Sequence, residues 1–174
     1  DVYMMWGEPV GAVREEIADV HTAAAKYGRK PAFSVSFRPI IAATEEKAWE
    51  KAHGYLERIL SLRKAAGAAV PANYKPQAVG SQRLLSLADR GEVHDKRLWT
   101  AIAAAVGAYG NTTALVGTPE QVVDSLLDYY DAGVTTILIR GFEPLEDASE
   151  YGREMIPMLR AEVAKRERVA VAAG

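Results

Sequence analysis

Two kinds of hydrophobic spacing alternate along the chain and predict strands followed by helices. Residues 113–141, TALVGTPEQVVDSLLDYYDAGVTTILIRG, show the pattern most completely. Apolar runs at both ends predict strands, and Val122, Leu126 and Tyr129 or Tyr130 recur between them at helical spacing. A connection this short predicts two parallel, paired strands joined by a right-handed crossover.

The predicted helix in this segment has clear start and stop signals. Thr118 and Gln121 have the spacing of a capping box, and Pro119 suits the first helical position. Gly133 suits the left-handed position just after the helix.

The same strand–helix unit recurs in the first 67 residues. Residues 1–6 and 32–41 predict strands. The first is followed by a helix that ends at Gly28, with an apolar stripe made of Val10, Val13, Ile17, Val20 and Tyr27. The second is followed by a helix that Thr44 caps and that ends near Gly67, with Trp49, Ala52, Leu56 and Ile59 facing inward.

The remainder is less regular. Residues 68–98 predict an irregular excursion rather than a hairpin, with a short helix over 82–89, and this length favours a functional or subunit-facing segment. Residues 99–109 predict a small Ala-rich helix, and the loop 109–113 follows it. Residues 145–166 predict a last helix that Pro157 bends.

Four successive strand–helix units indicate an α/β fold over residues 1–174. The units fit either a small doubly wound sheet or half of an eight-stranded (β/α)8 barrel. A strand at the first residue favours the half-barrel, whose other part would precede it. A half-barrel alone leaves two open strand edges, and pairing with a second copy would cover them.

Composition narrows the function classes. The net charge of -2 gives no reason to expect nucleic acid or an acidic membrane surface as a partner, and no apolar run reaches bilayer length. The absence of cysteine excludes disulfides and thiolate chemistry and agrees with a cytoplasmic protein. His21, His53 and His94 lack metal-ligand spacing, so no metal site is expected.

Strand parity brings candidate site residues together. In FSVSFRP, Ser34, Ser36 and Arg38 share the face opposite the apolar residues, and in TTILIRGF, Arg140 and Phe142 share one face. In a barrel the apolar face meets the helices and the other face lines the lumen, whose chemistry lies at the carboxyl ends of the strands. Trp6, Arg38, Arg140 and Phe142 would then face one pocket. Three of these residues also have a structural alternative: ion pairing for Arg38, a surface position for Arg140 and packing for Trp6.

Three phrases resemble the luciferase-like flavin-dependent monooxygenases, and within them the alkanesulfonate monooxygenase group. They are DVYMMWGEPVGAVREEIADV, FSVSFRPIIAATEEKAW and TALVGTPEQVVDSLLDYYDAGVTTILIRGFEPLEDA. The resemblance implies the C-terminal half of a barrel, strands five to eight. It also implies reduced FMN supplied by a flavin reductase (or F420 in some branches), with O2 and a small organic substrate, organosulfur compounds among them.

The resemblance assigns roles to individual residues. Trp6 matches the active-site Trp of the WGEP phrase and would also contact the flavin, most of whose site is expected in the other half. Ser36 and Arg38 stand where that group carries Arg and His, and Phe142 stands where it carries Tyr. The segment before TALVG lacks the expected Arg. These departures speak against sulfonate cleavage but leave a flavin monooxygenase of another specificity.

The resulting interpretation is a flavin-dependent monooxygenase. Arg38 and Trp6 are its catalytic candidates, and Ser36, Arg140 and Phe142 are its substrate-binding candidates. Arg38 would hold an anionic substrate or the oxygenated flavin, and Phe142 would supply an apolar wall. Two rivals remain: an F420-dependent dehydrogenase of the same superfamily, and an inactive half-barrel or binding module, since this segment alone is expected to be inactive.

Overall fold

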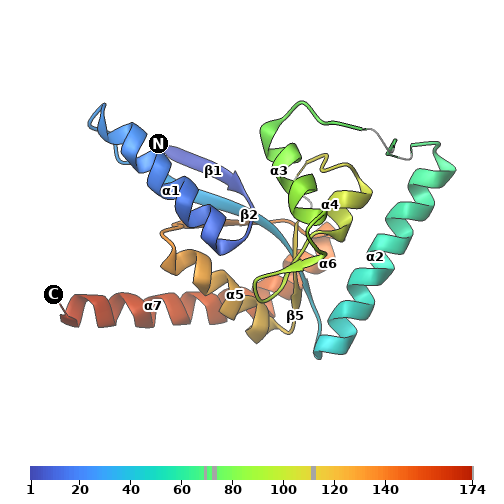
Figure 1. Cartoon of the computed structure of the whole chain (residues 1–174). Helices are drawn as coiled ribbons and strands as arrows, with labels where there is room; N and C mark the ends of the chain where they lie inside the picture. The colour runs from blue at the N-terminus through green and yellow to red at the C-terminus, as the bar shows by residue number, and fades with distance from the viewer. Residues whose placement is uncertain (69, 72–73, 111–112, 174) are drawn as a thin grey trace.

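The computed structural model describes residues 1–68, 70–71, 74–110 and 113–173. The first part contains β1 (Val2–Trp6), α1 (Val10–Ala25), β2 (Ala32–Ile41) and α2 (Glu45–Ala65). The second part contains α3 (Val79–Ala88), β3 (Val93–His94), β4 (Leu98–Trp99), α4 (Ala101–Ala105), β5 (Ala114–Gly117), α5 (Pro119–Asp131), β6 (Thr136–Ile139), α6 (Pro144–Glu150), a π-helix (Tyr151–Met155) and α7 (Ile156–Ala173). Figure 1 shows this alternation from β1 to the long α7. No described helix has the combination of length and apolar character that crossing a membrane requires.

Strand β2 is the centre of the sheet. It pairs in parallel with β1, β5 and β6. Its backbone bonds to β1 and β5 come from even-numbered residues, as in Gly7 N–H to Ser36 O and Arg38 N–H to Thr113 O. Its bonds to β6 come from odd-numbered residues, as in Arg140 N–H to Phe37 O. Strands β1 and β5 therefore follow one another along one edge of β2, and β6 occupies the other edge.

The prediction that the two strands of residues 113–141 pair with each other is wrong. Strands β5 and β6 are parallel, as expected, but each pairs with β2 instead. The ten residues of β2 make this possible because β6 pairs with positions 34–37 while β5 pairs with positions 38–41.

The main core lies between β2 and the helices α1, α5 and α7. Phe33, Val35 and Phe37 are at most 2% exposed and point toward these helices. Four of the five predicted apolar positions of α1 face this core. Val13 and Ile17 are buried in it, and Val10 and Val20 are partly buried and pack against it. Tyr27, the fifth predicted position, is 81% exposed because α1 ends at Ala25 and the chain leaves the helical spacing before it.

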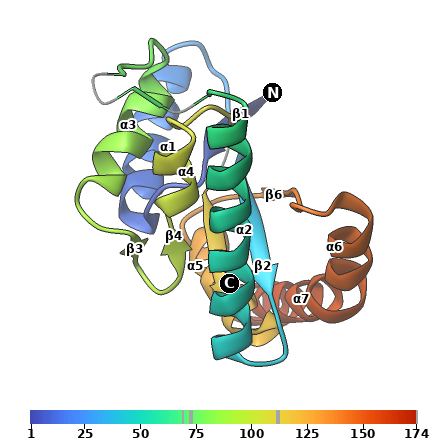
Figure 2. The same cartoon turned by 90° about the vertical axis from the view of Figure 1, so that its right-hand side faces the viewer.

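A second core covers the other face of the sheet near the end of β2. Helices α2 and α4 pack there against β5, as Figure 2 shows for α2 alongside β2. The members of this core are Ile40, Ala48, Ala52, Trp99, Ile102, Ala114 and Val116. The predicted inward residues of α2 contribute, with Ala52 fully buried and Trp49, Leu56 and Ile59 partly buried. The face expected to line a lumen is therefore covered by helices at its carboxyl end.

The segment 68–98 is more regular than predicted, and residues 69 and 72–73 lie outside the described part. Its helix is α3, which begins three residues earlier than expected. A hairpin, which the sequence argued against, forms between β3 and β4, and it extends the sheet because β4 pairs antiparallel with β5. Burial of Leu98 and Trp99 stabilises this pairing, and Asp95 adopts the left-handed φ of 48° that Asp tolerates in a turn.

The helix predicted over residues 99–109 is only five residues long. Trp99 belongs to β4, and the helix α4 stops at Ala105 because Gly107 and Ala108 both have positive φ angles. The predicted loop 109–113 includes residues 111–112, which lie outside the described part.

Two other helix starts agree with the sequence. The Thr118 hydroxyl accepts a hydrogen bond from Gln121 N–H, and the Gln121 side chain accepts one from Thr118 N–H, which completes the capping box. Thr44 caps α2 through Lys47 N–H. The single helix predicted over residues 145–166 is instead divided into α6, the π-helix and α7, and α7 continues to Ala173.

Candidate functional site

The candidate residues lie on one face of the sheet, opposite the main core. Trp6 is the cross-strand partner of Ser36, and Ser36 is also the partner of Leu138 on β6. Because side chains of paired residues point to the same side of a sheet, Trp6, Ser36 and Leu138 share the face that also carries Arg38. The predicted parity is confirmed for the residues within the strands. We call this surface, formed by Met4, Trp6, Ser34, Ser36, Arg38, Thr136, Leu138, Arg140 and Phe142, the open face.

The open face is only partly covered. Met4 is 66% exposed and Leu138 is 40% exposed, so two apolar side chains at its centre meet solvent. Ser36 is buried at 7% exposure beneath its larger neighbours. Trp6 is half-buried because the first turn of α3 lies against it: a Cβ placed on Gly80 would be 3.5 Å from Cε3 of the indole. The excursion that contains α3 therefore forms one wall beside Trp6.

Arg38 is held at the carboxyl end of the face by the turn after β6. Its Nη1 donates a hydrogen bond to the carbonyl of Gly141 over 2.9 Å. Its Cζ lies 5.2 Å from the centre of the Phe142 ring, which is a cation–π distance. The structure thus brings together Arg38 and Phe142, which are 104 positions apart in the chain by their numbers.

Arg140 stands beside Arg38. The two residues follow the last cross-strand pair, Phe37 and Ile139, so they occupy adjacent positions on the open face. Burial lowers the pKa of Arg38, and the positive charge of Arg140 lowers it further. Arg140 is exposed, and no ion pair joins it to any carboxylate within the described residues. Two positive charges therefore concentrate at one end of the face, an arrangement that favours an anion.

Sequence reasoning missed an aromatic residue that stacks on this site. The ring of Tyr55, from α2, lies 4.6 Å from that of Phe142 with an angle of 23° between the planes. Burial raises the pKa of Tyr55, and the negative charge of Asp147 adds to the effect. Arg38 and Tyr55 both lie against the ring of Phe142, and this stack stands at the end of the open face toward α2. No spacing in the sequence indicates this contact, because Tyr55 is one of several aromatic residues on helices.

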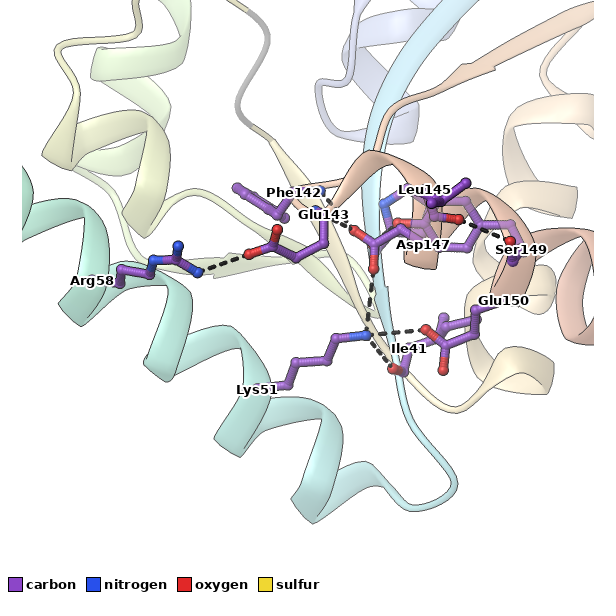
Figure 3. A network of polar contacts seen from close by, with 11 residues as sticks. Ile41, Lys51, Arg58, Phe142, Glu143, Leu145, Asp147, Ser149 and Glu150 are labelled. Carbon is purple, nitrogen blue, oxygen red and sulfur yellow. Dashed lines mark hydrogen bonds and ion pairs between the residues drawn. The ribbon is translucent and has the colours of Figure 1, made fainter.

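Sequence reasoning also missed the polar network behind the stack, drawn in Figure 3. Asp147 of α6 accepts hydrogen bonds from the backbone N–H groups of Phe142 and Glu143. Lys51 of α2 lies 3.6 Å from Asp147 and 3.0 Å from Glu150, and it also donates to the carbonyl of Ile41. The position of Asp147 in the first turn of α6 is a sequence signal for capping. Nothing in the sequence indicates its contact with Lys51 of α2.

The WGEP phrase contributes a second charged group near Trp6. Glu8 is 9% exposed and binds Arg83 of α3 over 2.6 Å, and Arg83 also lies 3.1 Å from Glu16. Burial raises the pKa of Glu8, although the hydrogen bond and charge of Arg83 act in the opposite direction. These ion pairs connect α3 to α1 and to the segment just before it. Glu8 and Arg83 also line a cleft of about 490 Å³ between the two helices.

Comparison with models of known protein families assigns the chain to one family. Residues 1–136 match the model of the family described as luciferase-like monooxygenase. The chain belongs to the luciferase-like monooxygenase family. The match includes Trp6, Ser36 and Arg38 and ends within β6, before Arg140 and Phe142.

Solved structures agree with the family on the fold. A riboflavin lyase, crystallised with modified FMN and riboflavin, superimposes with a TM-score of 0.63 at 19% identity, over 92% of this chain and 38% of that chain. The EDTA monooxygenase from Chelativorans sp. BNC1 gives 0.63 at 21% identity, over 92% and 39%. DmoA from Hyphomicrobium sulfonivorans gives 0.66 at 18% identity, over 92% and 37%. The chain spans less than two fifths of the length of these proteins, and its fold is an α/β half-barrel.

Proposed function

We propose that the chain forms strands five to eight of a flavin-dependent monooxygenase barrel. In the complete barrel the enzyme would use reduced FMN and O2 to oxidise a small organic substrate, organosulfur compounds among the candidates, and an anionic group on that substrate would meet the arginines. The observation that carries the proposal is the pair Arg38 and Arg140, side by side on the face that also bears Trp6 and Phe142. Family membership supports the flavin chemistry.

The residues on the open face fit one part of a flavin nucleotide. Trp6 offers a half-buried flat ring that would contact the isoalloxazine, and the two arginines offer positive charge for an anionic group. When bound, reduced FMN supplies the electrons and the oxygen-activating chemistry of the reaction. We propose that the rest of its site comes from the other half of the barrel, and that a flavin reductase delivers it.

The roles of the side chains follow from their surroundings. Arg38 lies in a partly desolvated position, where a positive charge stabilises developing negative charge more than it does in water. Phe142 and Trp6 would form apolar walls that keep water from the reacting groups. Ser36, buried between the partners Trp6 and Leu138, would place its hydroxyl at the floor of the site.

Anion binding by this chain tests the proposal directly. Inorganic sulfate serves as the probe, and its affinity is measured by isothermal titration calorimetry. Arg38→Ala and Arg140→Ala should each weaken sulfate binding by about tenfold, the loss expected for one charged hydrogen-bonding partner. Arg153→Ala, which removes a 69%-exposed arginine on the π-helix, is the matched control and should change nothing. Equal affinity in wild type and both site variants would remove the arginine pair from the proposal.

Oxygen consumption tests the reaction type. In the protein that combines this chain with the other barrel strands, reduced FMN and substrate should drive O2 uptake, and Arg38→Ala should cut turnover sharply with little change in melting temperature. Turnover without O2 uptake, with F420 as hydride carrier, would instead support the dehydrogenase. Sedimentation of the chain by itself would show whether two copies associate through the open edges.

A further inference from the structure

A buried carboxylate defines the turn after β6. The side chain of Asp147 is 4% exposed. Its Oδ2 accepts hydrogen bonds from Phe142 N–H over 2.7 Å and from Glu143 N–H over 2.9 Å (Figure 3). Charged acceptors make the stronger hydrogen bonds in proteins, and two of them on consecutive amides leave the backbone little freedom.

The carboxylate also packs directly against the backbone of this turn. A Cβ placed on Gly141 would lie 2.4 Å from Cβ and 2.5 Å from Oδ2 of Asp147. Any larger residue at position 141 would therefore displace the Asp147 side chain. The position of the carboxylate and the path of residues 141–143 are consequently coupled.

This turn supplies two of the contacts that orient Arg38. The carbonyl of Gly141 accepts the hydrogen bond from Nη1, and the ring of Phe142 lies against the guanidinium. Both groups belong to the two residues that Asp147 restrains. A change in the turn would thus move the hydrogen-bond acceptor and the aromatic surface of Arg38 together.

Lys51 in turn restrains Asp147. Its Nζ lies 3.6 Å from Oδ1, the oxygen that does not cap the turn, and it also contacts Glu150 and the carbonyl of Ile41 at the end of β2. Burial acts to lower the pKa of Lys51, but Glu150, Tyr55 and Asp147 together raise it. The lysine therefore stays charged, and it links the end of β2, three residues after Arg38, to α6.

We propose that Asp147 is the positioning residue of Arg38: it fixes the Gly141–Phe142 turn so that the guanidinium points along the open face toward an anionic ligand. Lys51 holds the Asp147 carboxylate in place. The inference rests on the proposed function for the role of Arg38 as an anion-binding residue. The orientation of the Arg38 side chain can nevertheless be measured without any ligand.

The experiment follows the guanidinium of Arg38 by NMR, assigned by its loss in Arg38→Ala. A donated hydrogen bond and a stacked ring slow rotation of the guanidinium, which separates its Nη proton signals. Asp147→Ala should abolish that separation and weaken sulfate binding by about tenfold. Asp147→Asn should keep most of the signal separation and most of the sulfate affinity, because the amide oxygen still accepts hydrogen bonds from the N–H groups of Phe142 and Glu143. Glu143→Gln, which alters an exposed ion pair with Arg58 in the same turn, is the control and should change neither.

The outcomes separate this inference from the proposed function. An Arg38 guanidinium that is equally restrained in wild type and Asp147→Ala overturns the positioning role, whatever happens to sulfate. A lower melting temperature with unchanged Arg38 signals would mean that Asp147 is only structural. If Asp147→Ala does not fold, Asp147→Glu keeps the charge but shifts the oxygens by one methylene, and unchanged Arg38 signals in it would equally refute the role. Wild-type protein that fails to bind sulfate counts against the proposed function alone.

Discussion

Replacing Gly7 by alanine should destabilise the chain substantially. Gly7 is buried at the end of β1, and a Cβ there would lie 2.3 Å from Cε1 and 2.4 Å from Cδ1 of Phe37. The same Cβ would lie 2.8 Å from Oγ1 of Thr113. Phe37 is fully buried and cannot move without disturbing Tyr129, whose ring lies 4.7 Å away.

The magnitude follows from two contributions. Forcing an extra methyl group into a packed core costs about 1–3 kcal/mol. Moving Tyr129 also weakens the buried hydrogen bond that its hydroxyl donates to the carbonyl of Glu8 over 2.8 Å, which adds about 1 kcal/mol. The free energy of unfolding should therefore fall by about 2–4 kcal/mol.

Gly54→Ala is the matched control for this substitution. Gly54 lies within α2, and a Cβ there would meet nothing within 4 Å. Alanine is about 1 kcal/mol more favourable than glycine in a helix, so this variant should be more stable than wild type. Urea unfolding followed by far-UV circular dichroism measures both variants. A Gly7→Ala variant as stable as wild type would refute the close packing of Gly7 on Phe37.

Three further outcomes follow from the same structure. The hydrogen bonds of Arg97 and Gln121 lower the pKa of Glu45 from 4.5 to about 2. The stabilising contribution of the Glu45 carboxylate is therefore present above pH 4.5 and is lost as the pH falls toward 2. Glu45→Gln should remove this dependence, so that the free energy of unfolding falls less steeply with acid than in wild type. Thr118→Ala removes the capping box and should lower the free energy of unfolding by about 1 kcal/mol, as measured by urea titration. Leu138→Lys, on the open face, should change the free energy of unfolding by at most about 0.5 kcal/mol, as measured by urea titration. A larger loss would mean that other side chains pack against Leu138.

The sequence alone predicted much of the local structure and the two faces of the sheet. The capping box at Thr118, the ten-residue β2 and the opposite orientations of Phe37 and Arg38 were all predicted, because each depends on residues that are neighbours in the chain. Hydrogen bonding at a helix start and alternation along a strand are short-range effects. The same patterns indicated an α/β fold but fitted a doubly wound sheet as well as a half-barrel, and the family resemblance favoured the half-barrel that the structure has.

Only the tertiary structure decided which segments meet. Side chains from α2 reach the turn after β6, so that Tyr55 stacks on Phe142 and Lys51 meets Asp147. The sequence could not predict these contacts, since they join positions about 90 residues apart and depend on how α2 packs over the sheet. The placement of β5 and β6 on opposite edges of β2 has the same origin. Periodicity specifies the face that a strand buries, whereas the choice of its neighbour depends on how the whole chain fills its core.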